Sequence, residues 1–127
     1  MTLKEILKKY SIDIDNVRCI EYYDDDENIR SFCLKEDTTI TVKGKEYLAR
    51  GGEYISFHEN WSIEKFCLVK NTPITVKGKE YLVKGDWYIS FYKNKSVEWF
   101  YLVKNTTITV KGKEYLAKGG EYISFYK

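Results

Sequence analysis

The fold of this chain is decided by residues 40–48, which read ITVKGKEYL. The same nine letters return at residues 74–82 and at residues 108–116, a spacing of 34 residues each time. The register extends beyond this stretch, since residues 66–93 and 100–127 differ at only five aligned positions. The 127-residue chain is therefore a tandem repeat of three units.

A single repeat domain is expected over residues 1–127, because one unit of this size cannot bury its own apolar face and must pack on its neighbours. The domain divides into a helical cap and connection, a degenerate half-unit and three repeats, at residues 1–16, 17–31, 32–65, 66–99 and 100–127.

The composition of the units indicates strands. Twelve Tyr and six Phe stand against a single Pro, and Ile-Thr-Val and Tyr-Ile-Ser-Phe segments alternate with Gly-containing turns. In the second unit we expect strands at residues 63–70, 74–77, 79–84 and 87–92, with residues 71–73 as a turn. The predicted fold class is all-β, an antiparallel meander with a short N-terminal helix.

Alternation within the strands predicts which side chains are buried, since neighbouring residues point to opposite faces of a sheet. Ile55 and Phe57 share one face and Tyr54 the other, and Leu82 opposes Tyr81. We expect the Ile, Phe, Leu and Val sets to form the core and the Tyr set to be partly exposed.

The N-terminal helix is predicted from Thr2 and Glu5, which fit a capping box, and from one apolar stripe. We expect this helix to cover one end of the repeat stack, as terminal caps do. An amphipathic helix that binds a partner is the alternative.

Hydropathy and cysteine usage argue against a membrane-spanning or secreted protein, and charge alone does not favour a nucleic-acid-binding one. The net charge of +2 is too small to indicate, by itself, binding to nucleic acid or to a membrane surface. No apolar run approaches the roughly 18 residues that span a bilayer, and the N-terminus does not read as a signal peptide. We therefore expect a cytoplasmic protein with reduced thiols, although Cys19 could lie across a hairpin from Cys33.

No pattern of catalytic or metal-binding residues is found, so we expect no enzyme and no cofactor. His58 is the only histidine, and Tyr92 and Tyr126 hold its place in the other units, which predicts an exposed strand residue. The run from Asp24 to Glu27 is expected to be a solvated acidic hairpin tip.

Two repeated features are candidate binding sites. One is a basic fringe at the hairpin tips, and the other is a ladder of tyrosines. Basic groups interleaved with aromatic rings could bind single-stranded nucleic acid, and the rings alone could stack on sugars, although a solubilising fringe and cross-strand packing would also explain them. The candidate residues are Lys43, Lys45, Lys77, Lys79, Lys111, Lys113, Tyr54, Tyr88, Tyr92, Tyr122 and Tyr126.

The unit resembles the MORN-type and related short β-hairpin repeats of bacterial proteins. The residues that carry the resemblance are Glu114-Tyr115-Leu116, Lys118-Gly119-Gly120 and Tyr122-Ile123-Ser124-Phe125. MORN units are shorter, and their closely spaced glycines are missing here. The resemblance covers residues 32–127 and implies protein or membrane contact rather than catalysis.

The sequence thus predicts a binding module that engages another macromolecule, most simply a protein, through its repeated face. Two alternatives remain open. One is a phage-type inhibitor of a host nucleic-acid enzyme, with the acidic tip imitating phosphate charge, and the other is a carbohydrate-binding protein. A homodimer formed edge to edge through residues 121–127 is also expected, because the chain ends while still strand-like.

Overall fold

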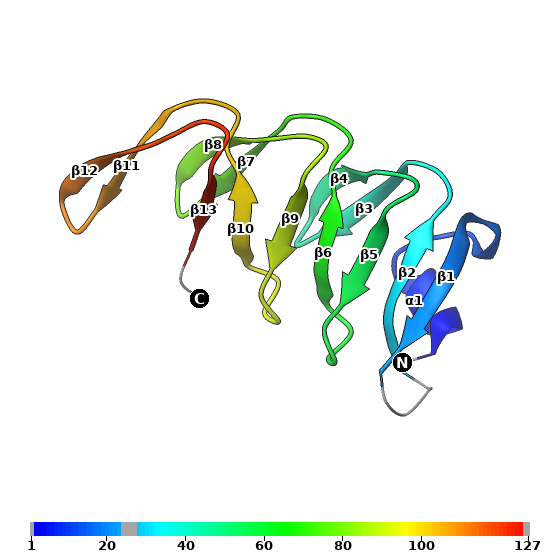
Figure 1. The fold of residues 1–127 in the computed structure, drawn as a ribbon. Coiled ribbons are helices and arrows are strands. Elements are labelled where there is room, and N and C mark those ends of the chain that lie inside the picture. Colours follow the sequence, from blue (N-terminus) through cyan, green and yellow to red (C-terminus); the bar gives the residue numbers. More distant parts are fainter. Residues whose placement is uncertain (1, 24–27, 126–127) are drawn as a thin grey trace.

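The computed structural model describes residues 2–23 and 28–125, and it is an all-β meander with one short helix (Figure 1). The helical elements are α1 (Leu3–Lys9) and one turn of 3₁₀ helix (Ile14–Asn16). The strands are β1 (Val17–Tyr22), β2 (Ile29–Leu34), β3 (Thr38–Val42), β4 (Lys45–Ala49), β5 (Tyr54–Phe57), β6 (Ile63–Cys67), β7 (Thr72–Val76), β8 (Lys79–Val83), β9 (Tyr88–Phe91), β10 (Val97–Tyr101), β11 (Thr106–Val110), β12 (Lys113–Ala117) and β13 (Tyr122–Ser124).

Seven of these strands form one antiparallel sheet in the order β1-β2-β5-β6-β9-β10-β13. The other six form three two-stranded hairpins, β3–β4, β7–β8 and β11–β12, each inserted between the two sheet strands of its unit. We call these three hairpins the arms. The side of the sheet on which the arms lie is called the hairpin face, and the opposite side is called the front face (Figure 1). The expectation of four antiparallel strands per unit is confirmed.

The repeated ITVKGKEYL stretch forms the arms, and its tight turns fix their shape. Lys43 has a φ of 51° and Gly44 a φ of 77°, the two left-handed residues of a type I′ turn. The turn brings Val42 opposite Lys45, and the arm then pairs in register as far as Thr38 and Ala49. The same geometry recurs in the other two arms.

Each arm is fastened at its base. The backbone N–H of Gly85 donates to Asn71 Oδ1 at 2.9 Å, and the equivalent bond joins Gly51 to Asp37 at 2.8 Å. A Cβ at Gly85 would lie 2.5 Å from the carbonyl carbon of Lys70, so only glycine allows the two chain segments to cross this closely. The repeated Gly therefore serves a close approach as well as a turn.

The core lies between the sheet and the arms. Five phenylalanines of the sheet point to the hairpin face and are at most 1% exposed, namely Phe32, Phe57, Phe66, Phe91 and Phe100. In each of the first two arms, a tyrosine side chain packs against the next unit. The ring of Tyr47 contacts Phe66 and Phe91, with centroids 5.7 and 5.8 Å apart.

The expected exposure of the tyrosines is wrong for the arms. Tyr47 and Tyr81 are 5% and 6% exposed, whereas Leu48 and Leu82, expected in the core, are half-buried. Alternation separates the two faces of an arm but does not tell which face meets the next unit. The arm docks through its tyrosine side because that side fills the space over the phenylalanines.

Two smaller expectations are also corrected. Thr72 and Pro73 belong to strand β7 rather than to a turn. His58 is half-buried just after β5, and its Nε2 lies 2.7 Å from the carbonyl oxygen of Phe91. Tyr92 makes the corresponding bond by donating to the carbonyl of Phe125, so this position joins each unit to the next.

The predicted helix begins with its capping box. Thr2 Oγ1 accepts from the backbone N–H of Glu5, and the N–H of Thr2 donates to Glu5 Oε1 at 3.1 Å. Ile6 and Leu7 are buried, and the ring of Tyr10 packs on Phe57 at 5.8 Å. Tyr10 thus makes on the first unit the kind of contact that Tyr47 makes on the second.

The three cysteines are free thiols. Cys33 and Cys67 are buried and Cys19 is exposed, so the conceivable Cys19–Cys33 bridge is not formed. The acidic tip at residues 24–27 lies outside the described residues. Within the described ranges, no helix has the length and apolar character needed to cross a bilayer.

Candidate functional site: a lysine-rimmed groove on the hairpin face

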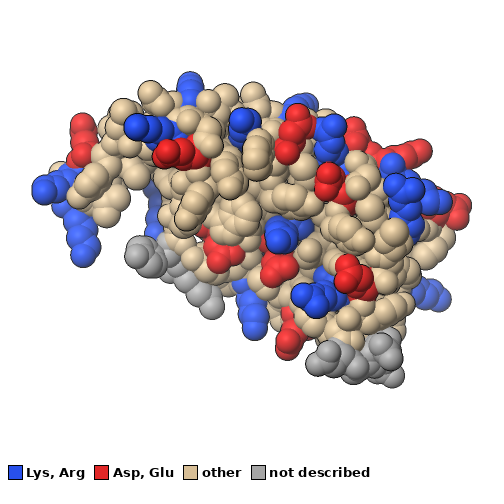
Figure 2. Space-filling view, viewed as in Figure 1, with Lys and Arg blue, Asp and Glu red and all other residues tan. Residues whose placement is uncertain are grey.

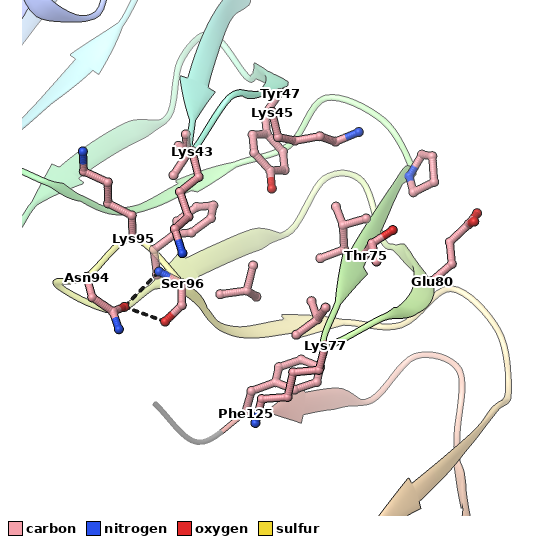
Figure 3. A pocket seen from close by; sticks show the side chains of 16 residues that line it. Lys43, Lys45, Tyr47, Thr75, Lys77, Glu80, Asn94, Lys95, Ser96 and Phe125 are labelled. Carbon is pink, nitrogen blue, oxygen red and sulfur yellow. Dashed lines mark hydrogen bonds between the residues drawn. The ribbon is translucent and has the colours of Figure 1, made fainter.

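A groove of about 720 Å³ separates the arms β3–β4 and β7–β8 (Figure 3). Its floor is apolar and is formed by the side chains of Tyr47, Ile74, Val76, Phe91, Val97 and Phe125. Four lysines and one glutamate also line it, namely Lys43, Lys45, Lys77, Lys95 and Glu80. The groove therefore combines an apolar floor with an excess of positive charge.

The arm turns place two of these lysines. Lys43 and Lys77 are the first residues of their type I′ turns, with φ of 51° and 52°, so their side chains leave from the arm tips. Lys45 is the residue after its turn, opposite Val42. Three of the six predicted lysines are thereby brought to one groove.

Lys95 was missed by the sequence analysis. It lies in the turn between β9 and β10, where Asn94 Oδ1 accepts from the backbone N–H of Ser96 at 3.0 Å (Figure 3). The N–H of Lys95 donates to the carbonyl of Tyr92 at 2.9 Å, and its φ is 74°. Trp61 holds the equivalent place one unit earlier, so the repeat pattern carried no signal for a lysine here.

A second groove of about 680 Å³ adjoins the first, between α1 and the arm β3–β4. Lys43 and Lys95 line both grooves, and Lys9 joins them from the end of α1. Burial, and after it the charge of Lys95, lowers the pKa of Lys9. Lys9 and Lys95 thus repel each other, and an anionic group between them would stabilise both charges.

The remaining predicted lysines lie elsewhere. Lys79 sits on the second arm, and Lys111 and Lys113 belong to the third arm. None of the three lines either groove. They provide matched controls, because they occupy the same repeat positions as Lys43, Lys45 and Lys77.

Three of the five predicted tyrosines lie on the front face, away from the lysines of the groove, whereas Tyr92 follows β9 and donates to the carbonyl of Phe125. Tyr54, Tyr88 and Tyr122 alternate with Ile55, Ile89 and Ile123, which pair with the inward phenylalanines. Tyr88 donates to Glu53 Oε2 at 2.9 Å, and burial, followed by this bond, raises its pKa. Tyr126 lies outside the described residues.

The front face carries an aromatic cluster toward its C-terminal side. Trp87 stacks on Tyr101 with centroids 4.7 Å apart, and Tyr101 contacts Trp99 and Tyr122 at 6.2 and 5.9 Å. Trp87 and Tyr122 remain 43% and 63% exposed. Figure 2 shows positive and negative side chains interspersed with uncharged surface on this side of the molecule.

The comparisons with protein-family models, curated proteins and solved structures gave no match. The resemblance to MORN-type repeats therefore rests on the residues quoted for it.

The buried tyrosines predict a loss of stability in alkali. Burial raises the pKa of Tyr47 from 10.0 to about 12, and burial also raises the pKa of Tyr81 and Tyr10. The folded protein holds these phenolic protons more tightly than the unfolded chain does. The stabilisation that the buried tyrosines give to the folded state is therefore complete below pH 10 and is lost as the pH rises toward 12.

Urea unfolding at pH 8 to 11.5, with tyrosinate absorbance followed in parallel, measures this effect. We expect constant stability up to about pH 9.5 and a decline above pH 10. The variant Tyr47→Phe, which has no phenolic proton at this site, should show a smaller decline. Equal stability of the wild type at pH 8 and pH 11 would contradict the prediction.

Proposed function

We propose that the protein is a non-enzymatic binding module that engages another protein through the hairpin face and holds an acidic segment of it in the lysine-rimmed groove. The observation that carries the proposal is the meeting of Lys43, Lys45, Lys77 and Lys95 in a groove of about 720 Å³ that has an apolar floor. An extended segment that alternates carboxylates with apolar side chains matches both properties of the groove.

A protein partner is favoured over single-stranded nucleic acid because the lysines of the groove and the exposed aromatic rings lie on opposite faces of the sheet. Base stacking needs exposed aromatic faces next to the phosphate-binding lysines. Of the rings that line the groove, Tyr47 and Phe91 are 5% and 1% exposed and Phe125 is half-buried. The exposed Tyr54 and Tyr122 lie on the front face. The phage-type inhibitor is an alternative of another class, in which the protein would occlude a host nucleic-acid enzyme, and the acidic tip that would imitate phosphate charge lies outside the described residues.

Sugar binding is the second candidate and uses the other side of the molecule. It is supported by the stacked Trp87–Tyr101 pair and the exposed Tyr122 beside it. Exposed aromatic rings can stack on sugar rings. Retention on immobilised oligosaccharides that is lost in Trp87→Ala would support this candidate.

The groove is tested with two labelled probes of equal length, a peptide of alternating glutamate and leucine and an oligo-dT strand. We expect the peptide to bind, and the double variant Lys43→Glu/Lys77→Glu to weaken its binding about tenfold, since two reversed contacts cost on the order of 1.4 kcal/mol. The control Lys79→Glu/Lys111→Glu carries the same change of charge outside the grooves and should stay within about twofold.

Fluorescence polarisation at low and at physiological salt measures both affinities. Equal weakening by the two double variants would mean that the whole basic fringe acts without the groove. Tighter binding of oligo-dT than of the peptide would replace the protein partner with nucleic acid.

A further inference from the structure

Each of the first two arms is completed by the unit that follows it. Tyr47 rests on Phe66 and Phe91, and Tyr81 rests on Phe100 and Phe125 at 5.7 and 5.5 Å. The arms thereby bury their tyrosine sides. One face of each of these two arms thus covers sheet residues of the next unit.

Backbone hydrogen bonds clamp the same junctions. The carbonyl of Leu48 accepts from the N–H of Val69 at 3.0 Å, and the N–H of Arg50 donates to the carbonyl of Cys67 at 2.8 Å. The second arm repeats both bonds one unit later, from Val103 to Leu82 at 3.1 Å and from Lys84 to Tyr101 at 2.8 Å. The incoming strand is therefore held by its backbone as well as by its side chains.

The third arm has no following unit within the described residues. Val110, Tyr115 and Leu116 are 48%, 50% and 62% exposed, whereas the equivalent Val42 and Tyr47 are 7% and 5% exposed. In the described part of the chain, the carbonyl of Leu116 and the N–H of Lys118 lack the partners that the first two arms have. Figure 1 shows the arm β11–β12 projecting past β13, the last strand of the sheet.

We propose that this open end, defined as the tyrosine side of β11–β12 and the outer edge of β13, binds an extended strand of another protein by β-strand addition. The incoming strand runs antiparallel to β13, as β6 does to β5 and β10 to β9. Its backbone pairs with Leu116 and Lys118, and its side chains fill the space beside Tyr115.

The strands β6 and β10 define the side chains that fit. Both present a phenylalanine and, two residues later, a leucine to the preceding arm, as Phe66 with Leu68 and Phe100 with Leu102. These four side chains are at most 1% exposed. The partner strand is therefore a Phe-x-Leu segment or one with apolar groups of similar size at the same spacing.

A second copy of this chain fits the open end less well. In an antiparallel sheet of seven strands the first and last run in the same direction, so β1 of another copy would meet β13 in parallel. The edge of β1 is also irregular, since Cys19 has a φ of 54° and the register shifts beside it.

The β13 edges of two copies can pair antiparallel, as the expected homodimer requires. The third arm of each copy would then meet strands of the other copy that are already covered by an arm. The two-fold axis of that pairing is perpendicular to the sheet, so the arms of both copies lie on the same side. In the partner copy β10 and β13 are already occupied by the arm β7–β8, because Tyr81 contacts Phe100 and Phe125. A strand without an arm of its own avoids this conflict.

The test uses the whole chain and a labelled synthetic peptide with the sequence of residues 95–104, which contains β10. We expect saturable binding at micromolar concentration, and at least tenfold weaker binding of a control peptide with aspartate at the places of Phe100 and Leu102. Tyr115→Asp should weaken binding of the first peptide at least tenfold. Thr109→Asp, a change at an exposed position of the same arm, should leave it within about twofold.

Hydrogen exchange supplies a readout that does not depend on the variants. Bound peptide should slow exchange of the Lys118 amide and of the amides at the outer edge of β13, with no change at the Arg50 and Lys84 amides. Equal binding of the two peptides, or protection confined to other strands, would overturn the proposal. Light scattering that shows a peptide-resistant dimer protected at β13 would also overturn it, in favour of the edge-to-edge homodimer.

Discussion

Deleting residues 100–127 is expected to lower the free energy of unfolding by about 3–5 kcal/mol, out of a total of about 5–15 kcal/mol for a domain of this kind. The deletion removes Phe100 and Tyr101 from the end of β10 and all of β13, which cover the second arm. Tyr81 and Val83, at most 6% exposed in the whole protein, would lose their contacts with Phe100, Phe125 and Leu102 and face solvent. The second arm would acquire the open end that the third arm now has.

Urea and thermal unfolding of the shortened chain, with light scattering to follow association, measures the effect. Thr109→Asp, a change at an exposed position of the third arm, is the control and should unfold like the wild type. If the shortened chain melted at the wild-type temperature and stayed monomeric, the units would be independent and the packing of arm on unit would contribute nothing measurable.

Replacing Phe66 with alanine is expected to destabilise the protein by about 3–5 kcal/mol, the usual cost of a cavity left by a buried phenylalanine. Phe66 is 1% exposed on β6, the fourth of the seven sheet strands. Its ring stacks on Phe91 at 5.8 Å and meets the edge of Tyr47 at 5.7 Å. The substitution therefore loosens the sheet and the first arm together.

Two controls separate this cavity from a general effect of changing the sheet. Phe66→Leu keeps most of the volume and should cost less than about 1.5 kcal/mol. Tyr122→Ala truncates a ring that is 63% exposed and should stay within about 0.5 kcal/mol. Equal unfolding midpoints for Phe66→Ala and Tyr122→Ala would mean that the Phe66 ring is not part of a cooperative core.

The 34-residue register and local chemistry predicted much of this fold. The Lys-Gly turns, the four strands of each unit and the capped N-terminal helix all follow from interactions between residues close in sequence. Such interactions do not depend on how the units are stacked. The strands and the all-β class were therefore readable without the structure.

The candidate site was predicted only in part, for the same reason. Lys43, Lys45 and Lys77 could be singled out because they repeat, but their meeting with Lys95 depends on how an arm lies against the turn between β9 and β10. The repeated tyrosines looked like one ladder in the sequence. In the structure Tyr47 lies in the core of the hairpin face and Tyr54 lies on the front face.

The sequence by itself determined the period, the strands and their turns, because those are set within about ten residues of chain. The tertiary structure alone decided which side of each arm is buried, since that depends on contacts such as Tyr47 with Phe91 that cross from one unit to the next. It also decided that the third arm, identical in its nine central residues to the other two, stays exposed. Burial of an arm is a property of its neighbour, and no neighbouring unit is described beyond β13.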